Sequence, residues 1–166
     1  MRILSVVLSF FLAILMSSCL NISRSSGTES ESPILQKDVN EIVTALENRD
    51  KVALKSMFSL NALKEAKNID AGLTYVMNFY KGTKKSVDGG LFKSSDASDH
   101  GSLSKTVEGE YRVTTDYDEY LIYFVDQVVD TEQPDNVGLY MLQVILAKDR
   151  QTEMLKNGRV AGIYTP

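Results

Sequence analysis

Apolar residues recur three or four positions apart in the segment that follows Ser32, which is the spacing of one face of an α-helix. The Ser32-Pro33 pair is typical of a helix start, with serine as the N-cap and proline at the first helical position. The sequence therefore predicts a helix that begins at Ser32, ends at Asn48-Arg49-Asp50 and buries one stripe of residues: Leu35, Val39, Ile42, Val43 and Leu46.

Further short helices are predicted before Gly82. Asp50 is placed to cap the second helix, and Ser59 to cap a further turn that runs through Lys67. Asp70 is the predicted cap of the next helix, which Gly82 ends. Apolar residues mark the faces that we expect to be buried: Val52, Leu54, Met57 and Phe58 in the second helix, and Ile69, Leu73, Val76, Met77 and Tyr80 in the last.

After Gly82 the apolar period changes to two, which is the period of a strand. Asp88-Gly89-Gly90 is a hairpin-turn signal and predicts two short paired strands around residues 84–87 and 91–94. Residues 94–102 are polar and are predicted to form a loop. From Leu103 to Val113 apolar and polar residues alternate, which predicts a strand with one face in water.

Two later segments, residues 119–130 and 137–147, are apolar on both faces. Strands of this kind are covered on both sides. Turn sequences join the strands, and Asn157-Gly158 leads into a last short strand over residues 159–164. Helices followed by a meandering antiparallel sheet predict an α+β domain, with N-terminal helices packed on a curved antiparallel sheet.

The second apolar face of that sheet needs a cover of its own, because no later segment predicts another helix of comparable length. A homodimer that pairs sheet to sheet would bury this face. Alternatively, residues 154–166 fold over it, or the sheet curls enough to enclose both sides. The sequence leaves these arrangements open.

The N-terminus has the pattern of an exported lipoprotein. Arg2 precedes an apolar run over residues 3–16, which is too short to span a bilayer, and Ser17-Ser18 precede Cys19. This order resembles the bacterial lipoprotein signal, in which the cysteine is lipidated and becomes the new N-terminus. The alternative is an ordinary signal peptide with a chance cysteine. We expect a lipid anchor at Cys19 that holds the protein to the cell membrane on its extracytoplasmic face.

Three segments follow from this interpretation. Residues 1–18 are the predicted signal peptide. Residues 19–32 are rich in Ser, Thr, Glu and Gly and form the lipidated, flexible tether. Residues 33–166 form a single α+β domain, because their number suits one hydrophobic core and is too small for two.

Composition excludes several classes of function. The chain has a net charge of −4, and removal of Arg2 with the signal makes it one unit more negative, which disfavours nucleic acid as a partner. Cys19 is the only cysteine and His100 the only histidine, so lipidation leaves no thiol for a disulfide, a nucleophile or a metal site. No cofactor or metal is predicted, and the acidic turn around Asp116 and Asp118 lacks the EF-hand spacing.

Few side chains are candidates for contact with a ligand. Gln127 and Gln143 each interrupt an apolar strand face and need a hydrogen-bond partner when they are buried. His100 lies in a polar stretch, where anchoring a surface loop is its simplest role. No catalytic residue is predicted, and the ligand-binding candidates are Tyr80, His100, Tyr123, Gln127, Met141 and Gln143.

Four stretches resemble a family of bacterial lipoproteins, domain of unknown function 5104. They are residues 45–50 with the following residues 54–67, the step Asp99-His100-Gly101, residues 111–116 and residues 129–138. The helices and curved sheet also resemble the nuclear transport factor 2-like, or cystatin-like, cone. This resemblance implies a pocket between the helices and the concave sheet face, where some members of that superfamily place an Asp or His for dehydration or isomerisation. It carries over no catalytic residue.

Three functions from different classes are compatible with these features. The first is a non-enzymatic protein that binds a small apolar ligand or a protein partner at the membrane surface. The second is a small-molecule lyase or isomerase that uses a pocket in the cone. The third is a structural interaction protein at the cell surface. The residues that line a pocket would discriminate among them.

The lipid anchor gives the first prediction. Cys19→Ser removes the acceptor thiol, so the protein is expected to remain uncleaved or to leave the membrane fraction. Ser17→Ala keeps a small residue before the cysteine and is expected to leave processing unchanged. Mass spectrometry of the mature wild-type N-terminus checks the assignment, and an unmodified first residue other than Cys19 would contradict it.

Overall fold

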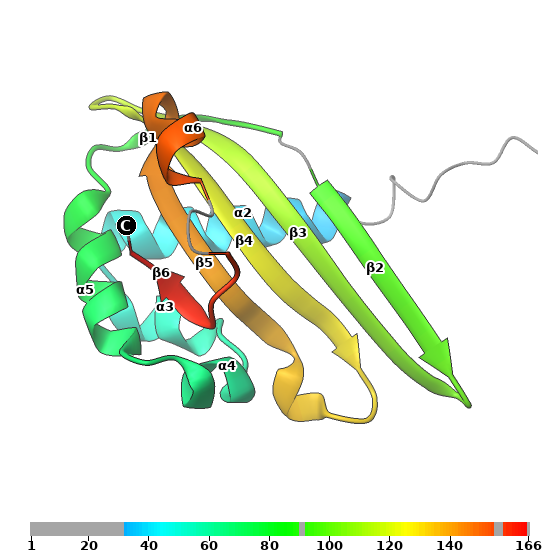
Figure 1. Cartoon of the computed structure of the whole chain (residues 1–166). Coiled ribbons are helices and arrows are strands. Elements are labelled where there is room, and N and C mark those ends of the chain that lie inside the picture. Colours follow the sequence, from blue (N-terminus) through cyan, green and yellow to red (C-terminus); the bar gives the residue numbers. More distant parts are fainter. Residues whose placement is uncertain (1–31, 90–91, 155–157, 166) are drawn as a thin grey trace, which may run out of the picture.

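The computed structural model describes residues 32–89, 92–154 and 158–165 of the 166-residue chain. Helices lead and strands follow, which confirms the predicted α+β class (Figure 1). The helices are α2 (Ser32–Asn48), α3 (Lys51–Ser56), α4 (Leu60–Glu65), α5 (Ile69–Phe79) and the short α6 (Arg150–Glu153). None of these has the length and apolar character needed to cross a membrane. The signal peptide, Cys19 and almost all of the predicted tether lie outside the described residues.

Local sequence signals set most of the helix boundaries. The stripe predicted for α2 is buried, and each of its five residues is at most 2% exposed. Asp50 caps α3 by accepting a hydrogen bond from the backbone of Ala53 at 2.8 Å, and Ser59 caps α4 in the same way from Ala62. These two cap predictions are confirmed.

Two helix predictions are wrong. Asn68, not Asp70, caps α5, because its Oδ1 accepts the Ala71 N–H at 3.0 Å. Asp70 lies within the first turn of α5, where the helix dipole still favours its charge. Val52 is 80% exposed instead of buried, because α3 has only six residues and turns Leu54 into the core.

The sheet has six strands: β1 (Lys84–Asp88), β2 (Phe92–Asp99), β3 (Ser102–Thr115), β4 (Glu119–Asp130), β5 (Gly138–Leu146) and β6 (Gly162–Tyr164). Its order is β1-β3-β4-β5-β6, with β2 also paired to β3. All pairs are antiparallel except β5 with β6. The short 3-10 helices η1 (Pro134–Asn136) and η2 (Ala147–Asp149) flank β5.

The predicted hairpin at Asp88-Gly89-Gly90 and the predicted loop at 94–102 are wrong. β1 and β2 do not pair with each other: Asp88 lies opposite Arg112 and Phe92 opposite Gly109, so both strands follow one edge of β3. The hairpin turn falls instead at His100-Gly101, where φ is 46° and 94°. Two positive φ values are the geometry of a tight β-hairpin turn. Apart from Ala97, residues 93–99 are polar, as suits an edge strand with little cover and no face to bury.

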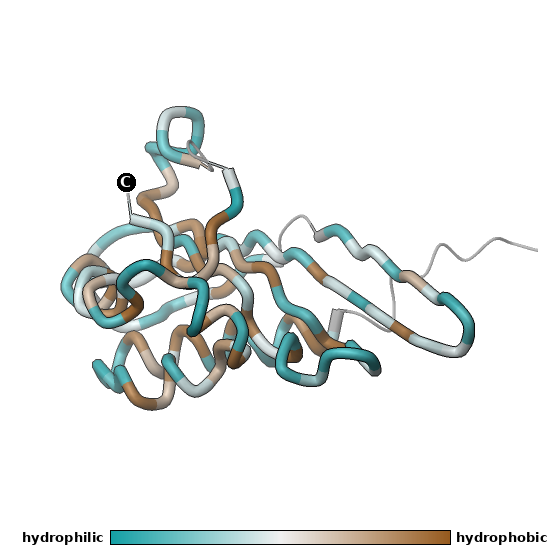
Figure 2. The backbone as a smooth tube through the Cα atoms, turned by 60° about the horizontal axis from the view of Figure 1, so that its bottom comes forward, coloured by the Kyte–Doolittle hydropathy of each residue, from teal (hydrophilic) through white to brown (hydrophobic). Residues whose placement is uncertain are grey.

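Both apolar faces of β4 and β5 are covered, as predicted. Tyr120, Ile122 and Phe124 of β4 pack with the helices, whereas Tyr123 and Val125 point to the other side. There the C-terminal segment (residues 150–154 and 158–165) lies over the sheet and contributes Met154, Val160 and Tyr164. Figure 2 shows the helices on one side of the sheet and this segment on the other. The C-terminal segment thus covers part of the face that motivated the homodimer, and the homodimer itself stays a prediction.

Polar contacts fasten the C-terminal segment to the sheet. Arg150 donates two hydrogen bonds to Glu110 of β3, at 2.9 and 3.1 Å, and Arg159 pairs with Glu108. Gln143 of β5 donates to the Glu153 carbonyl at 2.8 Å. Residues 150, 153 and 159 therefore attach this segment to β3 and β5.

The contact between α5 and β6 gives a second prediction. A Cβ added at Gly72 would lie 2.8 Å from Cβ of Ile163, so Gly72→Ala is expected to lower the free energy of unfolding by about 1–2 kcal/mol despite the better helix propensity of alanine. A Cβ added at Gly89 meets no atom within 4 Å. Gly89→Ala is therefore the matched control and is expected to be close to neutral. Urea denaturation checks both variants, and equal stabilities would contradict the prediction.

Candidate functional site

A pocket of about 240 Å³ lies where the first turns of α2 meet β4 and the start of β5. Its polar side carries Asp38 of α2 and Asp126 of β4, and its apolar rim includes Ile34, Val128 and Val137. The rim is partly open, with Ile34 38% and Val137 44% exposed. We call this the Asp38–Asp126 pocket.

A β-bulge helps to place Asp126. Between Val125 and Asp126 the register with β5 shifts, so that Asp126 lies opposite Leu139 and Tyr140 is skipped. On the other side Asp126 lies opposite Val107, a fully buried residue of the helix-side core. A bulge re-aims side chains and is common beside binding and catalytic sites. The result is a carboxyl group, 8% exposed, in a strand that is otherwise apolar on this face.

Asp38 lies on α2 beside the buried stripe. One of its carboxyl oxygens, Oδ2, is buried and has no hydrogen-bond partner among the described residues. Burial raises the pKa of Asp38 from 3.8 to about 6, with a further upward contribution from the charge of Asp126, while Lys37 opposes the shift. An unpartnered carboxylate oxygen is costly, so the group favours a proton or a donor from a ligand.

Asp126 is shifted in the same direction. Burial raises the pKa of its carboxyl group to about 6, and the charge of Lys37 and a hydrogen bond from the Gln127 backbone limit the shift. Two neighbouring carboxyl groups that both titrate near pH 6 can hold or release protons close to neutrality. Among the described residues, no three His, Cys, Asp or Glu side chains gather closely enough to hold a metal ion.

Backbone hydrogen bonds hold one wall of the pocket in place. The Leu139 N–H donates to the Met57 carbonyl at 2.9 Å, and the Ser59 N–H donates to the Leu139 carbonyl at 3.0 Å. Gly138 lies beside these two hydrogen bonds with a φ of 122°, and an added Cβ would lie 2.9 Å from the Met57 oxygen. Only glycine fits both the conformation and the space.

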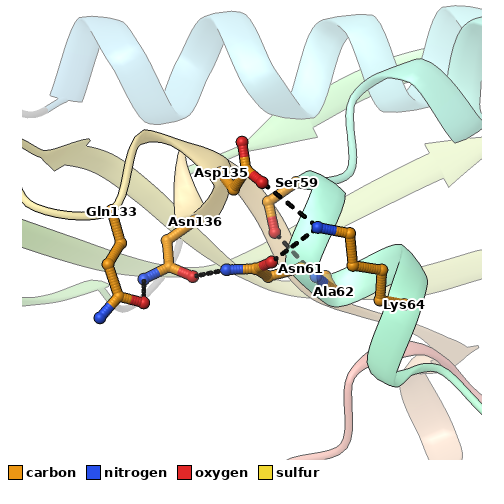
Figure 3. A network of polar contacts seen from close by, with 7 residues as sticks. All are labelled: Ser59, Asn61, Ala62, Lys64, Gln133, Asp135 and Asn136. Carbon is orange, nitrogen blue, oxygen red and sulfur yellow. Dashed lines mark hydrogen bonds and ion pairs between the residues drawn. The ribbon is translucent and has the colours of Figure 1, made fainter.

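A polar network supports the same wall from outside (Figure 3). Asn61 of α4 donates to Asn136 of η1 at 2.6 Å, and Lys64 forms an ion pair with Asp135 at 3.2 Å. Asn136 also donates to Asp130 at 2.8 Å. The network joins α4 to η1, the turn that directly precedes Val137. These contacts therefore hold the rim residue Val137 in position.

Gln127 is the one sequence candidate that lines this pocket. Its side chain is already satisfied: Oε1 accepts from Thr106 at 2.6 Å, and Nε2 donates to Ser104 at 2.9 Å and to the Val129 carbonyl at 2.7 Å. Because these hydrogen bonds already occupy both ends of the amide, we assign Gln127 a structural role beside the bulge.

Three other candidates lie on the opposite face of the sheet, beneath the C-terminal segment. Tyr123 and Met141 belong to the small apolar cluster there, and Gln143 is fully buried beside them. The Tyr123 hydroxyl donates to Glu108 at 2.7 Å. None of the three lines the Asp38–Asp126 pocket.

The remaining two candidates, Tyr80 and His100, differ in burial and lie in different parts of the fold. Tyr80 is 2% exposed and packs its ring 4.8 Å from that of Tyr120, in the core. His100 has a 94% exposed side chain in the β2–β3 turn and contacts the neighbouring Asp99. The six candidates therefore do not form one site. Neither carboxyl group is among the residues that the sequence pattern singled out, although Asp126 is a charge within an otherwise apolar strand.

The shifted carboxyl groups give a third prediction. Between pH 4 and 7 the folded state holds more protons on Asp126 than the unfolded state, so this group's stabilising contribution is complete below pH 3.8 and is lost as the pH rises through about 6. Asp126→Asn is therefore expected to raise the free energy of unfolding by about 1 kcal/mol at pH 7, after allowance for screening by water, with no gain at pH 4.

Urea denaturation at a series of pH values measures this difference. Asp88→Asn, at an exposed position of β1, is the control and is expected to leave the pH profile unchanged. A gain of the same size at pH 4 and pH 7 would show that Asp126 has an ordinary pKa.

Comparison with known proteins defines the family of the chain. No curated protein matches it. Residues 41–148 match the family described as Domain of unknown function (DUF5104), a segment that covers about two thirds of the chain. The matched segment contains Asp126 and strands β1 to β5, and it begins three residues after Asp38. The chain therefore belongs to the DUF5104 family.

Proposed function

We propose that this protein is a membrane-anchored, extracytoplasmic binding protein whose Asp38–Asp126 pocket takes a small ligand with an ammonium or similar donor group. The observation that carries the proposal is the carboxyl group of Asp38: the residue lines the pocket, and its buried Oδ2 lacks a donor among the described residues. A ligand donor would supply the missing hydrogen bond.

The charges of the pocket favour a cation. Asp38, Glu41 and Asp126 line it together with a single base, Lys37. Charge-assisted hydrogen bonds between an ammonium group and a carboxylate are stronger than neutral ones. The apolar rim suits a short alkyl or ring substituent, and a volume of about 240 Å³ limits the ligand to a small molecule.

The position of the pocket agrees with attachment to a membrane. Ile34 and Lys37 lie in the first turns of α2, so the proposed tether enters the domain beside the pocket. We also infer a nuclear transport factor 2-like cone, because helices cover one face of a curved sheet and the pocket opens between these two layers.

A lyase or isomerase is the second candidate. The observation in its favour is a pair of carboxyl groups with pKa values of about 6, which are suited to general acid–base chemistry near neutrality. His100 has no part in this proposal, because its exposed side chain in the β2–β3 turn is not among the lining residues of the pocket.

Thermal unfolding with matched probes tests the binding proposal, which is the fourth prediction. Alkylammonium ions from methyl to hexyl are compared with carboxylates of the same length. An ammonium ion at about ten times its Kd is expected to stabilise the fold by about 1.4 kcal/mol, which raises Tm by about 5 °C. The carboxylates are expected to give no rise.

Variants locate the effect. Asp38→Asn and Asp126→Asn are each expected to abolish the rise in Tm, whereas Asp88→Asn retains it. If no ammonium ion in the series stabilises the protein, or if carboxylates of equal length stabilise it as well, the proposal is wrong.

A further inference from the structure

Exposed apolar side chains gather beside the Asp38–Asp126 pocket. In the described part of the chain, seven large apolar side chains are well exposed, and four of them lie in this region: Ile34, Leu103, Val129 and Val137. Ile34 and Val137 line the rim of the pocket, and Val129 directly follows Val128, which also lines it. We call these four residues the apolar strip.

The register of the sheet places Leu103 and Val129 on the face that the helices cover. Side chains alternate along β3, so Leu103 and Lys105 point to the same side as Val107, which belongs to the helix-side core. Val129 lies opposite Lys105 and therefore shares this face, since a bulge accommodates the extra residue Val128. The strip thus continues the face of the sheet on which the pocket opens.

This end of the sheet lies beyond the helices. The far end of β3 and its turn with β2 extend past the helical layer (Figure 1). Leu103 is accordingly 52% exposed, and Val129 is 37% exposed. Neighbouring apolar side chains that face water are typical of a surface that binds an apolar group.

The strip is too small for a protein partner. A stable protein–protein interface takes about 20–30 residues from each side, whereas the strip has four. Charges also border it, because Lys105 and Asp96 of β2 form an ion pair at 3.6 Å on the same face. A narrow apolar surface of this kind fits a single hydrocarbon chain.

The strip and the pocket are continuous. Asp126 and Val129 are three residues apart on β4, a distance of about 10 Å, which about eight carbon atoms of an extended alkyl chain would span. The pocket, of about 240 Å³, holds a head group and the first carbon atoms, and Ile34 and Val137 line the rim over which a longer chain would leave. A ligand that matches both parts has a positive head and an apolar tail.

We propose that the ligand of the Asp38–Asp126 pocket is a cationic amphiphile, a primary amine with a long, unbranched alkyl chain that lies on the apolar strip. This proposal rests on the function proposed above and adds the class of ligand. The two carboxyl groups bind the ammonium group, and the strip removes part of the chain from water, which favours binding in proportion to the area that is covered.

Isothermal titration with hexylammonium and decylammonium, both below the concentration at which they form micelles, tests the proposal and is the fifth prediction. The four additional CH₂ groups of decylammonium are expected to lie half-buried on the strip. Decylammonium is therefore expected to bind about 15-fold more tightly than hexylammonium, or about twofold for each CH₂ group.

Leu103→Thr/Val129→Thr removes the apolar side chains of the strip outside the pocket. It is expected to bring the Kd of decylammonium close to that of hexylammonium and to leave the Kd of hexylammonium unchanged. Val52→Thr/Leu60→Thr is the matched control, because it replaces the same two residue types at exposed positions of α3 and α4. The control is expected to keep the full advantage of decylammonium.

The two amines separate this proposal from the function on which it rests. If hexylammonium binds and decylammonium binds no more tightly, or if both double variants lose the advantage equally, the strip does not hold the chain and only this proposal is wrong. If neither amine binds, the function proposed for the pocket is wrong as well. Sedimentation covers the remaining occupant: if Leu103→Thr/Val129→Thr converts a dimer into a monomer without changing the affinity for decylammonium, the strip is a contact between two copies and the proposal is wrong.

Discussion

The two central strands of this protein, β4 and β5, are apolar on both faces, and the rest of the structure follows from the need to shield both from water. Four helices bury one face, and the C-terminal segment covers the other. The ion pairs of Arg150 and Arg159 with β3 are partly exposed, and pairs of that kind are individually weak. The apolar contacts of Met154 and Val160 must therefore supply most of the stabilisation, while the ion pairs fix the path of the segment.

The Asp38–Asp126 pocket lies between the first turns of α2, β4 and the start of β5, where the sheet is only partly covered. The bulge in β4 shifts the register just before Asp126, and the first turns of α2 leave the rim partly open. A carboxyl group at this point costs stability at neutral pH, since burial has raised its pKa. Buried ionisable groups in a cleft are more frequent at functional sites than elsewhere, which is the physical basis for assigning a ligand to this pocket.

Unpartnered polar atoms do not mark a site by themselves. Among the described residues, Asp38, Tyr80 and Tyr164 each bury one such atom. Tyr80 and Tyr164 lie in the two buried apolar clusters and are each 2% exposed, whereas Asp38 lines a pocket that a ligand could fill. The distinction rests on the cavity beside the group, because only there can an outside molecule restore the hydrogen bond.

The sequence by itself determined the α+β class, the buried stripe of α2, the caps at Asp50 and Ser59 and the need for two covers on β4 and β5. These features depend on periodicity and on hydrogen bonds within a few residues, so the local sequence encodes them. Only the tertiary structure decided that β1 and β2 both pair with β3, because a polar edge strand carries no sequence pattern that specifies its partner. It alone also brought Asp38 to Asp126, 88 positions later in the chain, since that meeting depends on how a helix lies on a sheet.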